Sequence, residues 1–331
     1  GADAGMKPPI AISAEVRAAL HDGKPVVALE TAVLTHGLPR VPMAELAHVA
    51  GPAWNAALPA HVALAMAMEH AVRAAGAVPA TMAVVQGTLH AGLTASQIEQ
   101  LGSDPSVRKL STRDLGPCLA DGASGGLTVA ATLAACAAAG SRTFATGGIC
   151  GVHRGWHTIP DVSAELPALA RTPVLVTCAG AKSILDLPAT LEWLDTFGVP
   201  VVGMGTAHFP CFTCPPDARL PVSAQAADAK AVARLAHAHW RMGQPSAVLA
   251  VQPCPAAFAM ERSEFDRAVE QAERLAADSG IRGQAVTPFL LGHLASLTGG
   301  RSLRANVALL LANAELAARI SAALLDLDGG S

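Results

Sequence analysis

The chain has little charge, and it lacks both basic clusters and long apolar runs. Charged residues make up 15% of its 331 residues and the formal net charge is -3, which argues against the basic surface of a nucleic-acid-binding protein. No run approaches the roughly 18–20 consecutive apolar residues of a membrane span, and the alanine-rich stretch 127–139 is better explained as a buried helix. We therefore expect neither a nucleic-acid nor a membrane partner.

We also expect no signal peptide, and the cysteine pattern does not suggest a disulfide framework. The seven cysteines are odd in number and mostly stand in apolar runs, as expected in a reducing, cytoplasmic compartment. Cys211 and Cys214 have C-x-x-C spacing without a second pair nearby, so we interpret them as structural or incidental. Residues 1–5 precede Met6 and resemble the remnant of an expression tag, which leaves residues 6–331 as a single domain.

The sequence is rich in apolar residues, and strand-like runs alternate with helical patterns along the chain. Hydrophobic residues make up 51% of the chain, enough for a large buried core. Short apolar runs typical of buried parallel strands lie at 26–29, 81–85, 143–145, 174–177, 199–202 and 247–251. Helical patterns lie at 62–75, 127–139, 183–197, 223–242, 262–279 and 303–325. This alternation predicts an α/β fold, a three-layer α/β/α arrangement around a mainly parallel sheet.

Two segments fit this alternation less well. Pro200 lies inside the run 199–202, which favours an edge strand or a strand that begins after the proline. Residues 40–57 contain Pro42, a Gly51-Pro52 break and weak helical spacing. We interpret them as an inserted surface excursion of helix and loop.

Lys182 is the most conspicuous of only five lysines in the chain. It follows the predicted strand 174–177, and ligands in parallel α/β sheets bind beyond the carboxyl ends of strands. Its small and apolar neighbours predict a partly desolvated amine with a lowered pKa, as Schiff-base chemistry requires. The residues equally allow a structural lysine that reaches solvent, or a positive charge for a phosphate. The segment 183–186 is expected to open the next helix.

Glu30 ends the apolar strand 26–29, with His36 in the loop that follows. A carboxyl at such a place is expected to have a raised pKa and to act as a general acid or base. The alternative is that Glu30 only caps the next turn.

The glycine-rich loop 146–155 directly follows the predicted strand 143–145. Its glycines allow backbone amides to approach an anion closely, and His153 and Arg154 add donors. Asp161, Ser163 and Glu165 follow at a predicted helix start. Oxygen ligands of this kind suit Mg²⁺ or Mn²⁺, although Asp161 could equally be an ordinary helix cap.

Three further places carry polar groups that could contact a ligand. They are Arg113 with Asp114, the turn before Thr128 and Val129, and Asn306. An asparagine can present both a donor and an acceptor to an imide ring. The alternative for Asn306 is the usual polarity of a helix N-terminus.

In this order, these segments closely resemble the pseudouridine-5'-phosphate glycosidase family, also called indigoidine synthase A-like. The resemblance extends from about residue 10 to residue 325 and is interrupted mainly at 40–57. Its strongest parts are residues 26–30, 76–81, 144–155, 178–186, 287–291 and 297–306. Matches this long are far more specific than a short motif.

The resemblance implies an α/β/α fold, a homotrimer, and a bound divalent metal, Mn²⁺ or alternatively Mg²⁺. It implies that Lys182 forms an imine with ring-opened ribose 5-phosphate and that Glu30 moves a proton at the ring carbon. Asp161 matches the metal ligand. The positions that match contacts to the substrate are His90, Thr128, Val129, His153, Ser163, Ala164, Glu165 and Asn306.

The sequence also departs from the family around the substrate. His90 replaces the family's lysine, Glu165 replaces an aspartate, and His61 stands where an asparagine would align. Because Lys182 and Glu30 are retained, the sugar chemistry is expected to be intact while the ring partner differs. We therefore expect a C-glycosynthase that joins ribose 5-phosphate to a planar aromatic polyketide in antibiotic biosynthesis, similar to the alnumycin enzyme.

Two other functions are considered. The first is cleavage of pseudouridine 5'-phosphate to uracil and ribose 5-phosphate, which the retained Asn306 favours. The second, a sugar-phosphate-binding or scaffold protein without catalysis, is disfavoured because both Lys182 and Glu30 are present.

Overall fold

The computed structural model describes residues 10–329, so the expected tag remnant at residues 1–5 lies outside the described residues. The strands are β1 Ile10–Ile12, β2 Val26–Leu29, β3 Val78–Val85, β4 Thr88–Ala91, β5 Arg108–Leu110, β6 Gly125–Leu127, β7 Thr143–Ala145, β8 Leu175–Cys178, β9 Val201–Met204, β10 Ala224–Ala226 and β11 Val248–Val251. The α-helices are α1 Ala14–His21, α2 Ala32–His36, α3 Ala47–Ala50, α4 Ala60–Ala74, α5 Ala95–Ser103, α6 Thr112–Ala120, α7 Val129–Ala139, α8 Glu165–Ala170, α9 Leu187–Thr196, α10 Ala229–Arg241, α11 Arg262–Asp278, α12 Val286–Leu297 and α13 Arg301–Asp328.

Within the described residues, the strands form one sheet in the order β1-β4-β3-β2-β7-β8-β11-β9-β10, with β6 paired to β3 and β5 paired to β6. The centre, from β3 through β10, is parallel throughout. The β3–β4 and β3–β6 pairs are antiparallel. The predicted α/β fold with a mainly parallel sheet is confirmed.

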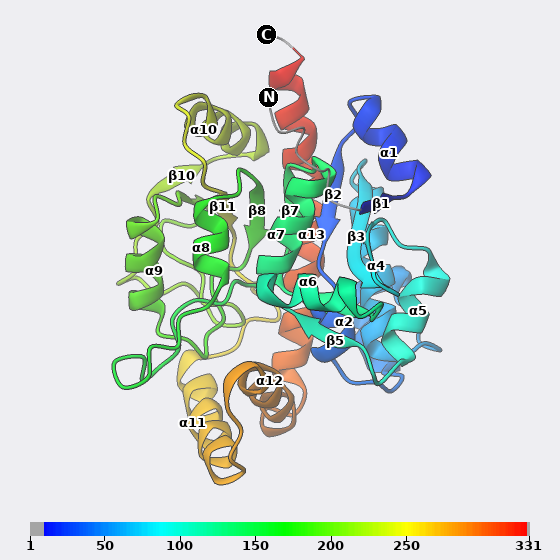
Figure 1. Cartoon of the computed structure of the whole chain (residues 1–331). Coiled ribbons are helices and arrows are strands. Elements are labelled where there is room, and N and C mark those ends of the chain that lie inside the picture. Colours follow the sequence, from blue (N-terminus) through cyan, green and yellow to red (C-terminus); the bar gives the residue numbers. More distant parts are fainter. Residues whose placement is uncertain (1–9, 330–331) are drawn as a thin grey trace.

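Helices cover both faces of this sheet, because the buried strand residues alternate between two apolar clusters (Figure 1). In β2, Val26 and Ala28 pack into the cluster that contains α7, whereas Val27 and Leu29 pack into the cluster that contains α4 and α13. Successive side chains of a strand point to opposite faces. A strand that is apolar at every position therefore needs a helical layer on each side.

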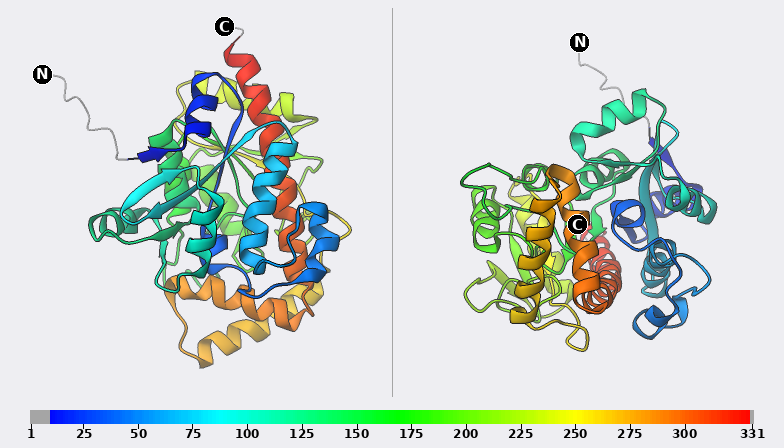
Figure 2. Two further views of the ribbon diagram at one scale, coloured as in Figure 1. Left: turned by 90° about the vertical axis from the view of Figure 1, so that its right-hand side faces the viewer. Right: turned by 90° about the horizontal axis from the view of Figure 1, so that it is seen from below.

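Helix α13 is the central helix of one layer and contacts β2, β7, β8 and α4. Figure 2 shows it running beside α4, with α11 and α12 at one end. It is long and apolar enough to span a membrane by length and composition, but 72% of its most apolar window is buried inside the protein. Its apolar surface is therefore explained by packing against the sheet.

The excursion at residues 40–57 is short helical turns and loop, as predicted. The 3-10 helices Ala44–Leu46 and Gly51–Ala53 flank α3. The side chains of Leu46 and Trp54 are buried in the cluster around α13, and Trp54 Nε1 donates to the carbonyl of Met43 at 3.0 Å. The excursion is thus anchored to the core by two large side chains.

Several boundaries differ from the predictions for identifiable reasons. Strand β9 begins after Pro200, as the proline suggested, and β10 lies outside it at the edge. The helix expected from residue 223 begins at Ala229, because Asp228 caps it by accepting a hydrogen bond from the amide of Ala231 at 2.7 Å. Strands such as β5 and β6 are only three residues long and carry Arg, Lys or Gly. They contain no apolar run from which a strand could be predicted.

Candidate functional site

Three neighbouring strands deliver Glu30, Thr146 and Lys182 to one edge of the sheet. Glu30 follows β2, Thr146 follows β7, and Lys182 lies just beyond β8, and these strands are adjacent in the order β2-β7-β8. All three residues line one cavity of about 530 Å³, which we call the large cavity. Its place beyond the carboxyl ends of parallel strands is where such folds bind ligands.

Glu30 lines the large cavity and is half-buried. Its carboxylate accepts a hydrogen bond from the hydroxyl of Thr146. Burial raises the pKa of Glu30, although the nearby Lys182 ammonium and the Thr146 hydroxyl lower it in part. The predicted raised pKa is confirmed, and a carboxyl with a raised pKa keeps its proton to higher pH than a free one, as a general acid requires.

Lys182 is surrounded by acidic groups. Its Nζ donates to Cys150 Sγ at 3.1 Å. Burial lowers the pKa of Lys182, but its electrostatic interactions with the Cys150, Glu165 and Glu30 side chains raise it more, so the net shift is upward. The predicted lowered pKa is wrong, because an apolar neighbourhood in sequence does not exclude carboxyls brought in by other segments.

The segment that carries Lys182 is held by backbone bonds to the glycine-rich loop. The amide of Lys182 donates to the carbonyl of Ile149 at 3.1 Å, and the amide of Ile149 donates to the carbonyl of Gly180 at 3.0 Å. Gly180 has φ 71°, and a β-carbon there would lie 1.9 Å from the carbonyl oxygen of Pro210. Only glycine fits such a conformation and approach.

The expected helix start at residues 183–186 is therefore wrong. Helix α9 begins at Leu187, after Asp186, whose carboxylate accepts a hydrogen bond from the amide of Ala189 at 3.1 Å. The residues before this cap bond to the glycine-rich loop instead of forming helical turns. Lys182 consequently opens a turn between β8 and α9, in which the amide of Leu185 donates to the carbonyl of Lys182 at 3.0 Å, and it lines the cavity.

Ser163, Ala164 and Glu165 line the large cavity together. The side chain of Ser163 accepts a hydrogen bond from the amide of Glu165 at 3.2 Å. Glu165 is only 5% exposed, and its carboxylate accepts from the amide of Cys150 at 2.6 Å. Burial raises the pKa of Glu165, with Lys182 opposing the shift. The cavity thus contains a second buried carboxyl besides Glu30.

Basic side chains form another part of the wall. His153 lines the large cavity as predicted, and so do Lys109, Arg113 and Arg171. Burial lowers the pKa of Lys109, and the Lys182 ammonium lowers it further. Burial also lowers the pKa of His153. The basic side chains of Lys109, Arg113 and Arg171 in one cavity suit a phosphate group.

Lys109 and Arg171 were not predicted as site residues. Lys109 belongs to the three-residue strand β5, and Arg171 directly follows the short helix α8. Neither has a motif around it. The scarcity of lysine was a usable signal for Lys109, whereas no signal in the sequence indicated Arg171.

Asp161 lines the same cavity, and its backbone carbonyl accepts a hydrogen bond from the amide of His153 at 3.0 Å. No group of three or more His, Cys, Asp or Glu side chains that could hold a metal occurs among the described residues. A hydrated Mg²⁺ or Mn²⁺ needs only one or two carboxylates when substrate oxygens and waters complete its shell. Asp161 fits a cation of that kind and not a closed protein cage.

The remaining predicted contact residues divide into two groups. Thr128 and Asn306 line the large cavity. Val129 lies at the first turn of α7 with its side chain 1% exposed in the core. His90 is half-buried on β4, opposite Ala83 and Ala11, and is not among the residues that line the cavity.

A second, more apolar cavity of about 250 Å³ adjoins the large one, and we call it the small cavity. The two share Lys182, Asn306 and Phe212, among other residues. Phe212 was not predicted, and it has φ 57°, a conformation uncommon for a residue with a side chain. Strained positions of this kind cluster at functional sites, but a sequence does not show them.

The Cys211–Cys214 pair forms the turn that carries Phe212. Both cysteines are free and buried, and the amide of Cys214 donates to the carbonyl of Cys211 at 3.0 Å. Burial raises the pKa of the Cys214 thiol to about 12. This turn therefore shapes the cavity wall, in keeping with a structural role for the pair.

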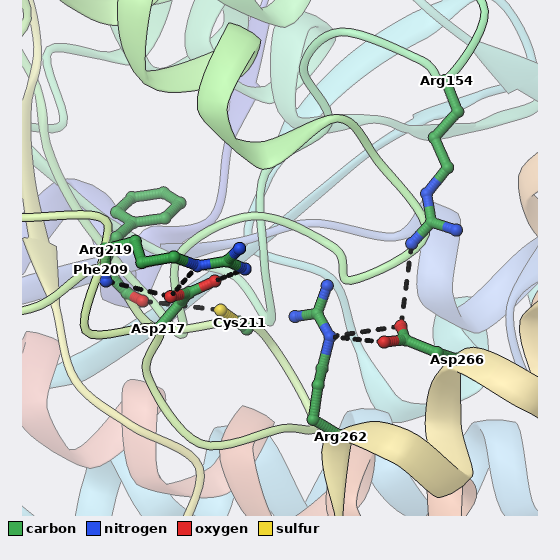
Figure 3. Close-up of polar contacts among 7 residues, drawn as sticks. All are labelled: Arg154, Phe209, Cys211, Asp217, Arg219, Arg262 and Asp266. Carbon is green, nitrogen blue, oxygen red and sulfur yellow. Dashed lines mark hydrogen bonds and ion pairs between the residues drawn. The ribbon is translucent and has the colours of Figure 1, made fainter.

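An ion pair joins the glycine-rich loop to α11 (Figure 3). Arg154 donates to the carbonyl of Ser183 at 3.2 Å and lies 3.9 Å from Asp266, which also pairs with Arg262 at 3.1 Å. Asp217 pairs with Arg219 beside Cys211. Arg154 thus connects α11 to the residue next to Lys182 and does not line the large cavity.

The chain matches one family model and is similar in sequence to enzymes that share one name. The family model described as "Indigoidine synthase A like protein" matches residues 15–323. The chain is 50% identical over 318 residues to the pseudouridine-5'-phosphate glycosidase of Roseiflexus sp., covering 95% of this chain and 96% of the relative. It is 46% identical over 325 residues to the enzyme of that name from Chloroflexus aurantiacus, covering 96% and 99%.

One solved protein of similar fold is named for C-glycoside synthesis, whereas the relatives above are named for cleavage. The fold is similar to the prealnumycin C-glycosynthase AlnA, solved in complex with ribulose 5-phosphate. The TM-score is 0.83 and the identity 36%, with 97% of this chain and 99% of that chain covered.

Proposed function

The chain belongs to the indigoidine synthase A-like family, and we propose that it cleaves pseudouridine 5'-phosphate reversibly to uracil and ribose 5-phosphate. As a member of this family it is an enzyme that acts on a C-glycosidic bond. The observation that carries the proposal is that the Lys182 amine, the Glu30 carboxyl and the Asn306 amide line one cavity.

The relatives favour cleavage over the C-glycosynthase reaction that the substituted contact residues suggested. Relatives named for the glycosidase reach 50% and 46% identity, whereas AlnA is 36% identical. His90, the clearest departure from the family, does not line the cavity, so its substitution is weaker evidence for a changed ring. Joining ribose 5-phosphate to an aromatic polyketide remains the second candidate, supported by the likeness to AlnA.

The chemistry follows from the kind of bond. A C-glycosidic bond has no leaving oxygen to protonate, so the two-carboxylate scheme of ordinary glycosidases does not apply. The Lys182 amine instead bonds the sugar carbon as the ring C–O bond opens. When Glu30 protonates the ring carbon, the electron pair of the carbon–carbon bond forms the new C–H bond. The nitrogen lone pair stabilises the sugar carbon as an imine, which water then hydrolyses to ribose 5-phosphate and the free amine.

The polarity of the wall supports a proposed placement of the two halves of the substrate. Lys109, Arg113 and Arg171 hold the sugar phosphate through charge-assisted hydrogen bonds. The ring lies toward Asn306 and Phe212, where the large cavity adjoins the apolar small cavity. Asn306 can then pair with the donor and acceptor edge of uracil.

A divalent cation, Mn²⁺ or Mg²⁺, is part of this proposal. Asp161 would hold it, with oxygen atoms of water and substrate as further ligands. The bound cation would supply positive charge that stabilises and orients the anionic substrate. The protein is also proposed to be a homotrimer.

The test is uracil release from pseudouridine 5'-phosphate by the purified enzyme, assayed after chelation and again with added Mn²⁺. We expect turnover at about 1–10³ s⁻¹, with activity lost on chelation and regained with Mn²⁺. No uracil release, together with C-glycoside formation from ribose 5-phosphate and a hydroxylated aromatic ring, would establish the second candidate instead.

A further inference from the structure

Cys150, which has no role in the chemistry above, hydrogen-bonds the reacting amine of Lys182. Cys150 lies in the glycine-rich loop and lines the large cavity. Its Sγ accepts a hydrogen bond from Lys182 Nζ at 3.1 Å. A sulfur atom that touches the nucleophile can exchange a proton with it directly.

The same cysteine is connected on its other side to a buried carboxyl. The amide of Cys150 donates to the carboxylate of Glu165 at 2.6 Å. The Cys150 side chain also lowers the pKa of Glu165, whose side chain is nearly inaccessible to solvent. Cys150 therefore connects the two residues, through its thiol to Lys182 and through its amide to Glu165, in a series that begins at the reacting nitrogen.

The reaction needs such a series, because Lys182 is held as an ammonium. An amine can attack a carbonyl carbon only after it loses a proton, and the resulting carbinolamine must gain a proton to lose water. Glu30 is assigned to the ring carbon. Glu165 is the other buried carboxyl with a connection to Lys182.

We propose that Cys150 is a further catalytic residue, whose thiol carries a proton between the Lys182 amine and the Glu165 carboxyl while the imine forms and breaks. This inference rests on the proposed lysine-imine function and adds the residue that runs its proton transfers.

The proton transfer balances. The Lys182 ammonium gives a proton to Sγ while the thiol proton of Cys150 passes to the Glu165 carboxylate, which leaves a neutral amine, a thiol and a carboxylic acid. The amine lone pair forms the bond to C1 of the ring-opened sugar, and one amine proton moves to the carbonyl oxygen. The Glu165 proton then returns through the thiol to the hydroxyl, water leaves, and a protonated imine remains beside the Glu165 carboxylate.

Other charged groups face Lys182 and affect the same equilibrium. The groups from the surrounding elements are Glu30 after β2, Lys109 on β5, Cys150 and His153 in the glycine-rich loop, and Glu165 on α8. Of these, only Cys150 has a hydrogen bond to Lys182 Nζ among the described contacts. The thiol is thus the direct route from the ammonium.

The test measures imine formation alone, by mixing enzyme with ribose 5-phosphate and trapping the Lys182 adduct with borohydride at successive times and pH values. In Cys150→Ala we expect trapping at neutral pH to be slower by about 10²-fold, the lower range for general acid–base catalysis. The deficit should shrink as pH rises, because hydroxide then removes the ammonium proton. Cys150→Ser should regain part of the rate.

Two further variants separate the relay from general damage. Glu165→Gln can still accept from the Cys150 amide but cannot take a proton, so it should show the same defect, and the double variant should be no slower than either single one. Cys136→Ala, a buried cysteine of α7 outside the cavity, should trap the adduct at the wild-type rate.

Trapping by Cys150→Ala at the wild-type rate over the whole pH range would overturn the proposal, as would a deficit that does not change with pH. If the wild-type enzyme forms the adduct but releases no uracil, the proposed substrate fails and the relay stands. If the wild-type enzyme forms no adduct, both the imine function and the relay are overturned.

Discussion

The pKa values of single residues in this site are shifted by groups that are distant in the sequence. Glu30 and Glu165 are both buried carboxyls with raised pKa values, and Lys182 lies between them with a raised pKa of its own. Burial disfavours an isolated charge, so a buried ammonium is stable only with negative partners. The same partners that hold Lys182 in the cavity also oppose its deprotonation.

Replacing the proposed nucleophile tests the covalent mechanism most directly. Lys182→Ala should reduce uracil release by more than about 10³-fold, because the imine cannot form. Mass spectrometry after borohydride treatment with ribose 5-phosphate should show no adduct. Lys230→Ala, at an exposed position of α10, is the matched control and should retain both adduct and activity. An adduct that persists in Lys182→Ala would assign the imine to another lysine.

Glu30 should be needed for the ring step and not for the sugar step. In Glu30→Gln, uracil release should fall by about 10²–10⁴-fold, since the amide cannot donate the proton that the ring carbon requires. Borohydride should still trap the ribose 5-phosphate adduct at a rate near that of the wild type. Equal loss of both steps would show that Glu30 acts mainly by holding Lys182.

The raised pKa of Glu165 also predicts a pH dependence of stability. The folded protein binds the carboxyl proton more tightly than the unfolded chain, so the free energy of unfolding should fall as pH rises from about the ordinary value of 4.5 through the raised pKa. Glu165→Gln has no such proton to lose, so its melting temperature should fall less over this interval. Thermal unfolding followed at several pH values measures both curves. Identical slopes in the two proteins would contradict the assignment.

At the scale of elements, α13 fixes the loop that holds Glu30. The side-chain amide of Asn313, 1% exposed, donates to the carbonyls of Thr146 and Gly147 at 2.9 and 3.3 Å. Gln252 in turn donates to Asn313 at 3.0 Å. A helix, the loop after β7 and the loop after β11 are thereby joined through one buried side chain.

Removing this connection should affect both stability and activity. Asn313→Ala removes the side-chain donor of the buried Thr146 carbonyl, whereas the Gly147 carbonyl still accepts from the amide of Ala179 at 2.8 Å. The loss of the Thr146 bond costs about 1–3 kcal/mol in the free energy of unfolding. Because Thr146 then loses its support, kcat should fall as well. Asn306→Ala, on the same helix but facing the cavity, should instead raise KM for pseudouridine 5'-phosphate with little change in melting temperature. Denaturant unfolding and steady-state kinetics of the two variants provide the comparison.

Elements with long apolar runs could be predicted, and short ones could not. The runs that became β2, β7 and β11 were found within a residue, because both faces of these strands are buried. Strand β6, Gly-Gly-Leu, has almost no side chains to form a pattern, and it is ordered by pairing with β3 and β5. The start of α9 was predicted four residues early, because the hydrogen bonds that hold residues before Asp186 come from another loop.

For the whole molecule, the proposed homotrimer can be tested by measuring the mass of the assembly. We expect light scattering after size exclusion to give three times the mass of the chain. His90, on β4 and away from the cavity of its own chain, would then be a residue to examine at the contact between subunits. A single-chain mass with full activity would contradict the trimer and show that one chain forms the complete site.

Several features of this protein were determined by the sequence alone. Hydrophobic periodicity predicted a parallel α/β sheet covered on both faces, and long matching segments placed Lys182, Glu30 and Asp161 in one family of enzymes. These conclusions depend on local patterns and on residue identity, which a sequence contains directly. Glu165, His153 and Asn306 line the large cavity, and their contacts to the substrate stay predictions.

Only the tertiary structure determined the charge environment of those residues. The pKa of Lys182 was expected to be lowered and is raised, because Cys150, Glu165 and Glu30 meet it from three separate segments. Lys109, Arg171 and Phe212 entered the site in the same way. Electrostatic interaction depends on distance and burial, and neither can be read from spacing along a chain.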